Sequence, residues 1–192
     1  MKTDRTILRE DDTLFRWVGA IYVITVALAV AYSWVIGVHR FDMGLTVSLY
    51  VGLHIWTSVF YFLAASVICV MLGWFVCRKP VPPLRRVVYL LALFCVFGCA
   101  WFPCNGERSR LVEDIHNYFS YALVILVAVS FFLLAVMPGN ARRKGYGLVS
   151  TVFAVLFTAA FALRIRPFKD TIFLWENGII ALFFFGLYQE KP

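Results

Sequence analysis

The stretch WVGAIYVITVALAVAYSWVIG, from Trp17 to Gly37, contains no charged residue. A helix needs roughly 20 mainly apolar residues to cross a hydrocarbon core of about 30 Å, and it pairs every backbone amide and carbonyl within itself. Tryptophans stand near both ends of the stretch, where their amphipathic rings favour the membrane interface. The stretch therefore predicts a transmembrane helix.

The rest of the chain repeats this pattern. Of its 192 residues, 62% are hydrophobic and 15% charged, which is typical of a membrane protein. Five further apolar runs cover 45–77, 87–102, 115–137, 145–163 and 171–188. We predict an all-α fold, a polytopic transmembrane bundle of about six spans in 17–188. A cytoplasmic N-terminal segment, 1–16, precedes it, and a cytoplasmic tail, 189–192, follows it.

The second run is longer than one crossing by about a dozen residues. We therefore expect its start to lie along or above the membrane surface, with His54 near the interface. Four polar side chains, Tyr50, His54, Ser58 and Tyr61, recur at spacings of four, four and three, which puts them on one helical face. This polar face could line a pocket, or it could bond to neighbouring helices.

The basic residues predict the orientation. The net charge is +7, but Lys and Arg flank apolar runs and form no basic and aromatic surface, so we expect no nucleic-acid partner. Twelve of them lie in the N-terminal segment, the second and fourth loops and the tail, against six on the opposite side. This asymmetry predicts that both termini are cytoplasmic.

Glu176 is the residue hardest to explain by lipid contact or helix packing alone, since a carboxylate inside a transmembrane helix is costly to leave in hydrocarbon. Arg164 and Arg166, just before the sixth run, are its candidate partners. Glu176, paired with one of these arginines, could bind a ligand or handle protons. Alternatively, Glu176 and an arginine form a salt bridge that only fixes the packing of helices. A third reading is that the sixth span begins later in the sequence than Glu176.

Asp114 and His116 stand at the expected start of the fourth span, near Cys104 in the sequence. Together they suggest a nucleophile or a metal site, but the chain has neither a Cys-x-x-Cys nor a His-x-x-x-His pair. The alternative is that Asp114 caps the helix and His116 lies at the interface. The chain has five cysteines, an odd number. A single disulfide bond between Cys99 and Cys104 is an open alternative.

The segments AWFPCNG and EDIHNYFSYAL resemble a family of six-helix prokaryotic membrane proteins catalogued as domain of unknown function 998. In that pattern a Phe-Pro pair closes the third helix and a His opens the fourth, here Phe102, Pro103 and His116. DRAM, Frag and Sfk-like membrane proteins are more distantly similar. The resemblance implies a six-helix bundle in a prokaryotic plasma membrane and implies no particular chemistry.

These observations favour a non-enzymatic membrane protein with an outer-face polar pocket. The expected ligand-binding residues are His54, Asp114, His116, Arg164, Arg166 and Glu176. The pocket would hold a lipid or another amphiphile, or dock a protein partner in the membrane. We predict no catalytic residue, metal or cofactor.

Two alternatives belong to other classes. A redox protein would use His54 and His116 as the two axial ligands of a b-type haem. A membrane hydrolase or transferase would use Cys104, Asp114 and His116.

Overall fold

The computed structural model describes residues 4–36, 42–43, 45–52, 54–103, 110–163, 165–166 and 170–190. Helices make up most of these residues, and no strand occurs among them. The helices are α1 (Asp4–Val35), α2 (Val47–Gly52), α3 (Ile55–Arg78), α4 (Pro83–Trp101), α5 (Arg110–Val136), α6 (Ala141–Ala162) and α8 (Ile172–Tyr188). The prediction of an all-α fold is therefore confirmed for the described part of the chain.

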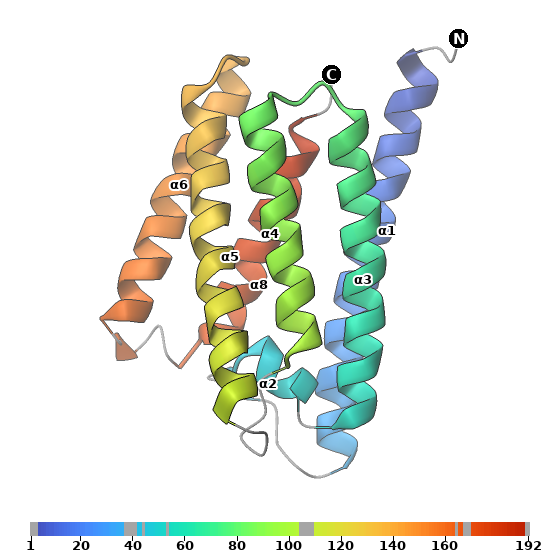
Figure 1. Ribbon diagram of the computed structural model, residues 1–192, viewed down its shortest axis with the longest axis vertical. Coiled ribbons are helices and arrows are strands. Elements are labelled where there is room, and N and C mark those ends of the chain that lie inside the picture. The colour runs from blue at the N-terminus through green and yellow to red at the C-terminus, as the bar shows by residue number, and fades with distance from the viewer. Residues whose placement is uncertain are drawn as a thin grey trace.

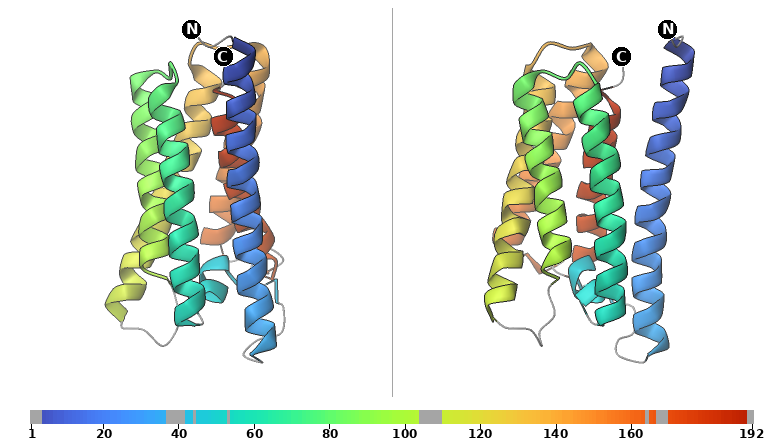
Figure 2. Two further views of the ribbon diagram at one scale, coloured as in Figure 1. Left: turned by 90° about the vertical axis from the view of Figure 1, so that its right-hand side faces the viewer. Right: turned by 45° about the vertical axis from the view of Figure 1, so that its right-hand side comes forward.

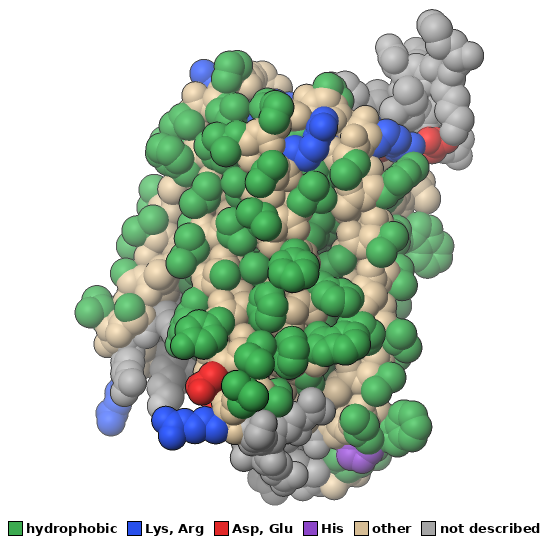
Figure 3. Space-filling view, viewed as in Figure 1, with side chains coloured by type: hydrophobic (Ala, Val, Ile, Leu, Met, Phe, Trp, Pro, Cys, Tyr) green, Lys and Arg blue, Asp and Glu red, His purple; other side chains and the backbone are tan. Residues whose placement is uncertain are grey.

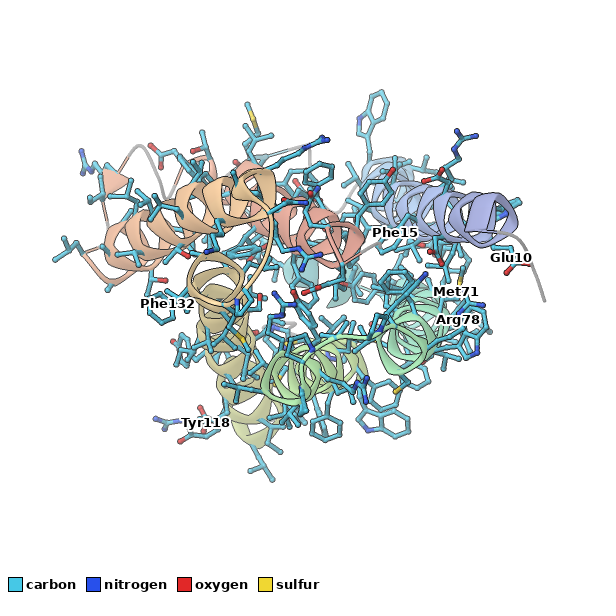
Figure 4. The ribbon with its side chains drawn as sticks, turned by 90° about the horizontal axis from the view of Figure 1, so that it is seen from above. Glu10, Phe15, Met71, Arg78, Tyr118 and Phe132 are labelled. Carbon is cyan, nitrogen blue, oxygen red and sulfur yellow. The ribbon has the colours of Figure 1, made fainter. Side chains whose placement is uncertain are left out.

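The six longer described helices run side by side (Figure 1), and seen from above they form a ring (Figure 4). Neighbours along the chain are also neighbours in space, because α1 contacts α3, α3 contacts α4, α4 contacts α5, α5 contacts α6 and α6 contacts α8. The ring closes between α8 and α1, where Tyr188 meets Phe15 edge to face with ring centroids 5.3 Å apart. Figure 4 looks along the helices and shows Phe15 of α1 close to α8.

The bundle has two distinct ends. Both termini lie at one of them, which we call the termini end, and the short helix α2 lies at the other, which we call the α2 end (Figures 1 and 2). Since α2 is held between α1, α3 and α8, it covers the interior of the ring at its end.

The outside of the bundle is apolar. Four of the described helices are long and apolar enough to cross a membrane, namely Glu10–Val35 of α1, α3, α4 and α5. Large hydrophobic side chains such as Trp34, Val70 and Ile125 are exposed, and Figure 3 shows such side chains between charged residues near both ends. An exposed apolar surface of this kind is compatible with lipid and unfavourable in water. The six crossings and their orientation stay predictions.

Prolines and Asn140 define several helix ends. Pro83 is the first residue of α4, where a missing amide costs nothing. The same helix ends at Trp101, directly before Phe102 and Pro103. Asn140 accepts a hydrogen bond through Oδ1 from the Arg143 amide at 2.8 Å and so caps the start of α6.

The long second run is divided at His54. Its first part forms α2, and His54 is the N-cap of α3, with Nδ1 accepting from the Trp56 amide at 3.3 Å. The prediction of one continuous polar face is therefore wrong. Tyr50 belongs to α2, where its hydroxyl bonds to the Asp42 backbone at 2.7 and 2.9 Å. Ser58 donates to the Val51 carbonyl and so ties α3 to α2.

The two predicted extramembrane segments also pack onto the bundle. Helix α1 begins at Asp4, well before the predicted span, and Asp11 and Leu14 on it are buried. Glu190, in the predicted tail, is buried at the same end. Residues that the sequence pattern places in water thus have partners within the bundle.

Candidate ligand-binding cavity

A cavity of about 390 Å³ lies inside the ring, in the half nearer the α2 end. All seven described helices contribute to its wall. Its aliphatic and aromatic lining includes Ala64, Ile68, Val124, Phe157 and Ile180. The volume falls within the range of about 300–1,000 Å³ that small-molecule pockets occupy.

The polar groups of the cavity are few and come from several helices. They are Tyr22 and Thr25 of α1, Tyr61 of α3, Cys99 of α4, His116, Ser120 and Tyr121 of α5, Thr158 of α6 and Glu176 of α8. A mostly apolar wall with a few convergent polar groups is the usual composition of a ligand pocket.

Glu176 connects α8 to α2. Its Oε2 accepts a hydrogen bond of 2.8 Å from the backbone amide of Val47, the first residue of α2. A second bond holds the same two segments together, because the Phe173 amide donates to the Met43 carbonyl at 3.0 Å. Glu176 and Val47 both line the cavity, so this contact closes its end.

Tyr22 and Asn177 form the polar contact between α1 and α8. The Tyr22 hydroxyl donates to Asn177 Oδ1 at 2.8 Å, and Asn177 Nδ2 donates to the Phe173 carbonyl at 2.7 Å. Both polar atoms of the amide are therefore used, which explains how Asn177 is tolerated inside an apolar helix.

On the opposite wall, α4 and α5 meet through Cys99 and His116. The Cys99 thiol, which is free, lies 3.4 Å from the Ser120 hydroxyl. His116 Nδ1 lies 2.6 Å from the Phe102 carbonyl at the end of α4, and a carbonyl can only accept, so this nitrogen donates. The His116 ring thus holds the start of α5 to the end of α4 while also lining the cavity.

The cavity brings together two of the six predicted ligand-binding residues, His116 and Glu176. His54 caps α3 and does not line it. Asp114 is an exposed residue of α5, and because that helix begins at Arg110 the prediction that Asp114 caps it is wrong. Arg166 is exposed, and no described ion pair joins it to Glu176, while Arg164 lies outside the described residues.

The residues of the two alternative functions are placed as follows. His54 and His116 each bond through Nδ1 to a nearby backbone group. Because the Cys99 thiol is free, the Cys99–Cys104 bridge that the sequence left open is not formed. Cys104 lies outside the described residues, so the group of Cys104, Asp114 and His116 cannot be described. In the part of the chain that the structure covers, no three His, Cys, Asp or Glu side chains form a group that could hold a metal ion.

Several cavity residues were not singled out from the sequence. They include Tyr22 and Thr25, which lie three positions apart, and Ser120, which lies four positions after the predicted site residue His116, so each pair shares a helical face. These spacings were the only sequence signal that these residues could line a common cavity. Which faces meet at the centre depends on how each helix is rotated, which the spacing does not determine.

A buried ionic network at the termini end was also missed. Glu190 accepts from Arg85 Nη2 through Oε2 and from the Tyr89 hydroxyl through Oε1, both at 3.0 Å. Arg143 Nη1 lies 3.7 Å from the same Oε2. The side chains of Arg85 and Glu190 are only 2% and 3% exposed, so the network joins α4, α6 and the end of α8 away from water.

A second ionic contact joins α1 to α3 at the same end. Asp11 is fully buried and pairs with both Lys79 and Arg78, the latter at 3.1 Å. Glu10 lies 3.7 Å from the other Nη of Arg78, with both side chains about one third exposed. Figure 4 shows Glu10 and Arg78 on neighbouring helices at the edge of the bundle.

No family model, no curated protein and no solved structure matches this chain. The resemblance to the domain of unknown function 998 therefore stays a prediction, and the cavity is the feature from which a function can be inferred.

Proposed function

We propose that this protein is a non-enzymatic integral membrane protein whose cavity binds a lipid or another single-chain amphiphile. The observation that carries the proposal is the cavity of about 390 Å³ within a bundle whose outside is itself apolar. A molecule dissolved in the surrounding lipid would reach such an interior from the membrane. The volume suits one acyl chain or a drug-sized molecule better than a whole two-chain phospholipid.

The proposal includes the membrane topology. Helices α6 and α8 also cross, which gives six spans, and the α2 end faces outward. The basic loop residues support this orientation, since Arg78, Arg86 and Arg142 belong to the termini end, as the predicted cytoplasmic face requires. The membrane is a prokaryotic plasma membrane, and the lipid-exposed outside leaves room for a protein partner.

A cavity-filling substitution tests the proposal. Ala64 lines the cavity, so Ala64→Phe places a ring in the space that a ligand needs. We expect the affinity of the purified protein in lipid nanodiscs for the neutral fluorescent probe N-phenyl-1-naphthylamine to fall about tenfold or more, the factor that corresponds to 1.4 kcal/mol. Fluorescence titration against empty nanodiscs measures this affinity.

Ala27→Phe is the matched control, because Ala27 is exposed on the outside of α1. We expect this variant to bind the probe like the unsubstituted protein. Equal affinities of the Ala64 and Ala27 variants, or no binding by the unsubstituted protein, would contradict the proposal.

A further inference from the structure

Among the described residues, the cavity wall contains one acidic side chain and no Lys or Arg. Of the described residues that form its wall, Glu176 is the only Asp or Glu, and none is Lys or Arg. The described basic residues of the bundle are concentrated near its ends, at the termini end in particular. An ionised Glu176 therefore gives the interior a negative charge that no side chain on the wall balances.

Glu176 also keeps bonding capacity. An ionised carboxylate has two oxygens and about four acceptor positions. Within the described part of the chain, the Val47 amide is its one hydrogen-bond donor, at Oε2, and no ion pair reaches either oxygen. A buried carboxylate without a cation is costly, so a bound cation would remove a cost that the empty cavity carries.

Aromatic rings stand close to this carboxylate. The Tyr22 hydroxyl donates to Asn177, the residue that follows Glu176, and Tyr22 and Tyr61 line the same cavity as the carboxylate. The face of an aromatic ring attracts an ammonium group within about 6 Å of its centroid. A carboxylate beside tyrosine rings is a suitable environment for an organic cation.

The remaining wall is apolar along the helices toward the termini end, with Ile68, Val127 and Phe183 on three different helices. An apolar chain placed there would extend from a headgroup at Glu176. The cavity thus has one acidic end and one apolar part, which matches a molecule with a cationic head and a hydrocarbon tail.

We propose that the cavity selects cationic amphiphiles, with Glu176 binding the ammonium headgroup and the apolar wall binding the tail. This inference rests on the proposed function, since it specifies the class of amphiphile. Anionic and neutral amphiphiles of the same length bind more weakly, because the first is repelled by Glu176 and the second leaves the carboxylate without a cation.

Three probes with the same twelve-carbon chain test the selection: dodecyltrimethylammonium, 1-dodecanol and dodecyl sulfate. Each displaces N-phenyl-1-naphthylamine from the full-length protein in nanodiscs, with empty nanodiscs as background. We expect the unsubstituted protein to bind the cation about tenfold more tightly than the alcohol, and the sulfate most weakly.

The matched variant is Glu176→Gln, whose side-chain oxygen can still accept from Val47 while its charge is removed. We expect this variant to bind the cation and the alcohol with equal affinity. A preference for the cation that survives in Glu176→Gln overturns the inference.

The two proposals fail in different ways. If the unsubstituted protein binds the cation and the alcohol equally, the selection is wrong and the amphiphile cavity stands. If it binds none of the probes, both are wrong. Should Glu176→Gln not fold, the comparison of the three probes on the unsubstituted protein still decides the inference.

Discussion

Replacing Glu190 by alanine is expected to destabilise the protein by about 3–5 kcal/mol, the usual effect of removing one partner of a buried ion pair. The carboxylate bonds to Arg85 and Tyr89 and lies near Arg143. Without it the Arg85 guanidinium, whose side chain is 2% exposed, stays buried with no opposite charge. Unfolding of the purified protein in mild detergent, followed by tryptophan fluorescence, measures the loss.

Glu10→Ala is the matched control for this prediction. Glu10 pairs with Arg78 at the same end of the bundle, but both side chains are about one third exposed. Such a pair contributes about 0–1 kcal/mol. If Glu190→Ala is no less stable than Glu10→Ala, the ionic network does not support the bundle as described.

The second large effect is expected at Gly147, where the backbone of α6 lies close to that of α5. A Cβ atom there would lie 2.5 Å from the Ala135 amide nitrogen and 2.8 Å from the Phe131 carbonyl oxygen. Both neighbours are backbone atoms, which a change of rotamer cannot move. Small residues allow such close contact between membrane helices, so Gly147→Leu is expected to separate α5 from α6.

We expect Gly147→Leu to lower the free energy of unfolding by about 3 kcal/mol, which is in the upper part of the usual range for overpacking. Gly145, two positions earlier on the same helix, provides the control, because a Cβ atom added there would have no neighbouring atom within 4 Å. The same detergent unfolding experiment compares Gly145→Leu with Gly147→Leu. Equal stabilities would show that the two helices do not pack at Gly147.

The helices themselves were predictable because their signal is local. The length of each apolar run and the prolines that bound it are properties of consecutive residues, and these gave ends close to those observed for α4 and α8. The start of α1 was not predictable in this way. Its polar first turns look like a solvated segment, and only the buried contacts of Asp11 with α3 explain why they are helical.

The ionic network of Arg85, Arg143 and Glu190 could not be predicted from the sequence. Arg85 and Glu190 are 105 positions apart, and nothing near either residue indicates the other. In the sequence Arg85 and Arg143 serve as indicators of orientation, and Glu190 belongs to a short tail. Their pairing depends on the order of helices around the ring, which is a property of the whole fold.

The candidate site was predictable in part for a similar reason. Glu176 and His116 stand out as polar residues in apolar runs, and both line the cavity. Asp114 does not, because residues two positions apart on a helix point to different sides, so the wall that contains His116 excludes it. His54 was assigned to a continuous helix, whereas the chain breaks there and its ring serves the local cap.

An experimental structure of the protein in a lipid nanodisc tests the central claim most directly. We expect elongated non-protein density inside the ring, with one end beside Glu176 and the rest along the apolar wall, in a bundle whose hydrocarbon-facing surface is the one described. Helices packed without an internal space, or a cavity open to water with no bound molecule at any amphiphile concentration, would contradict it.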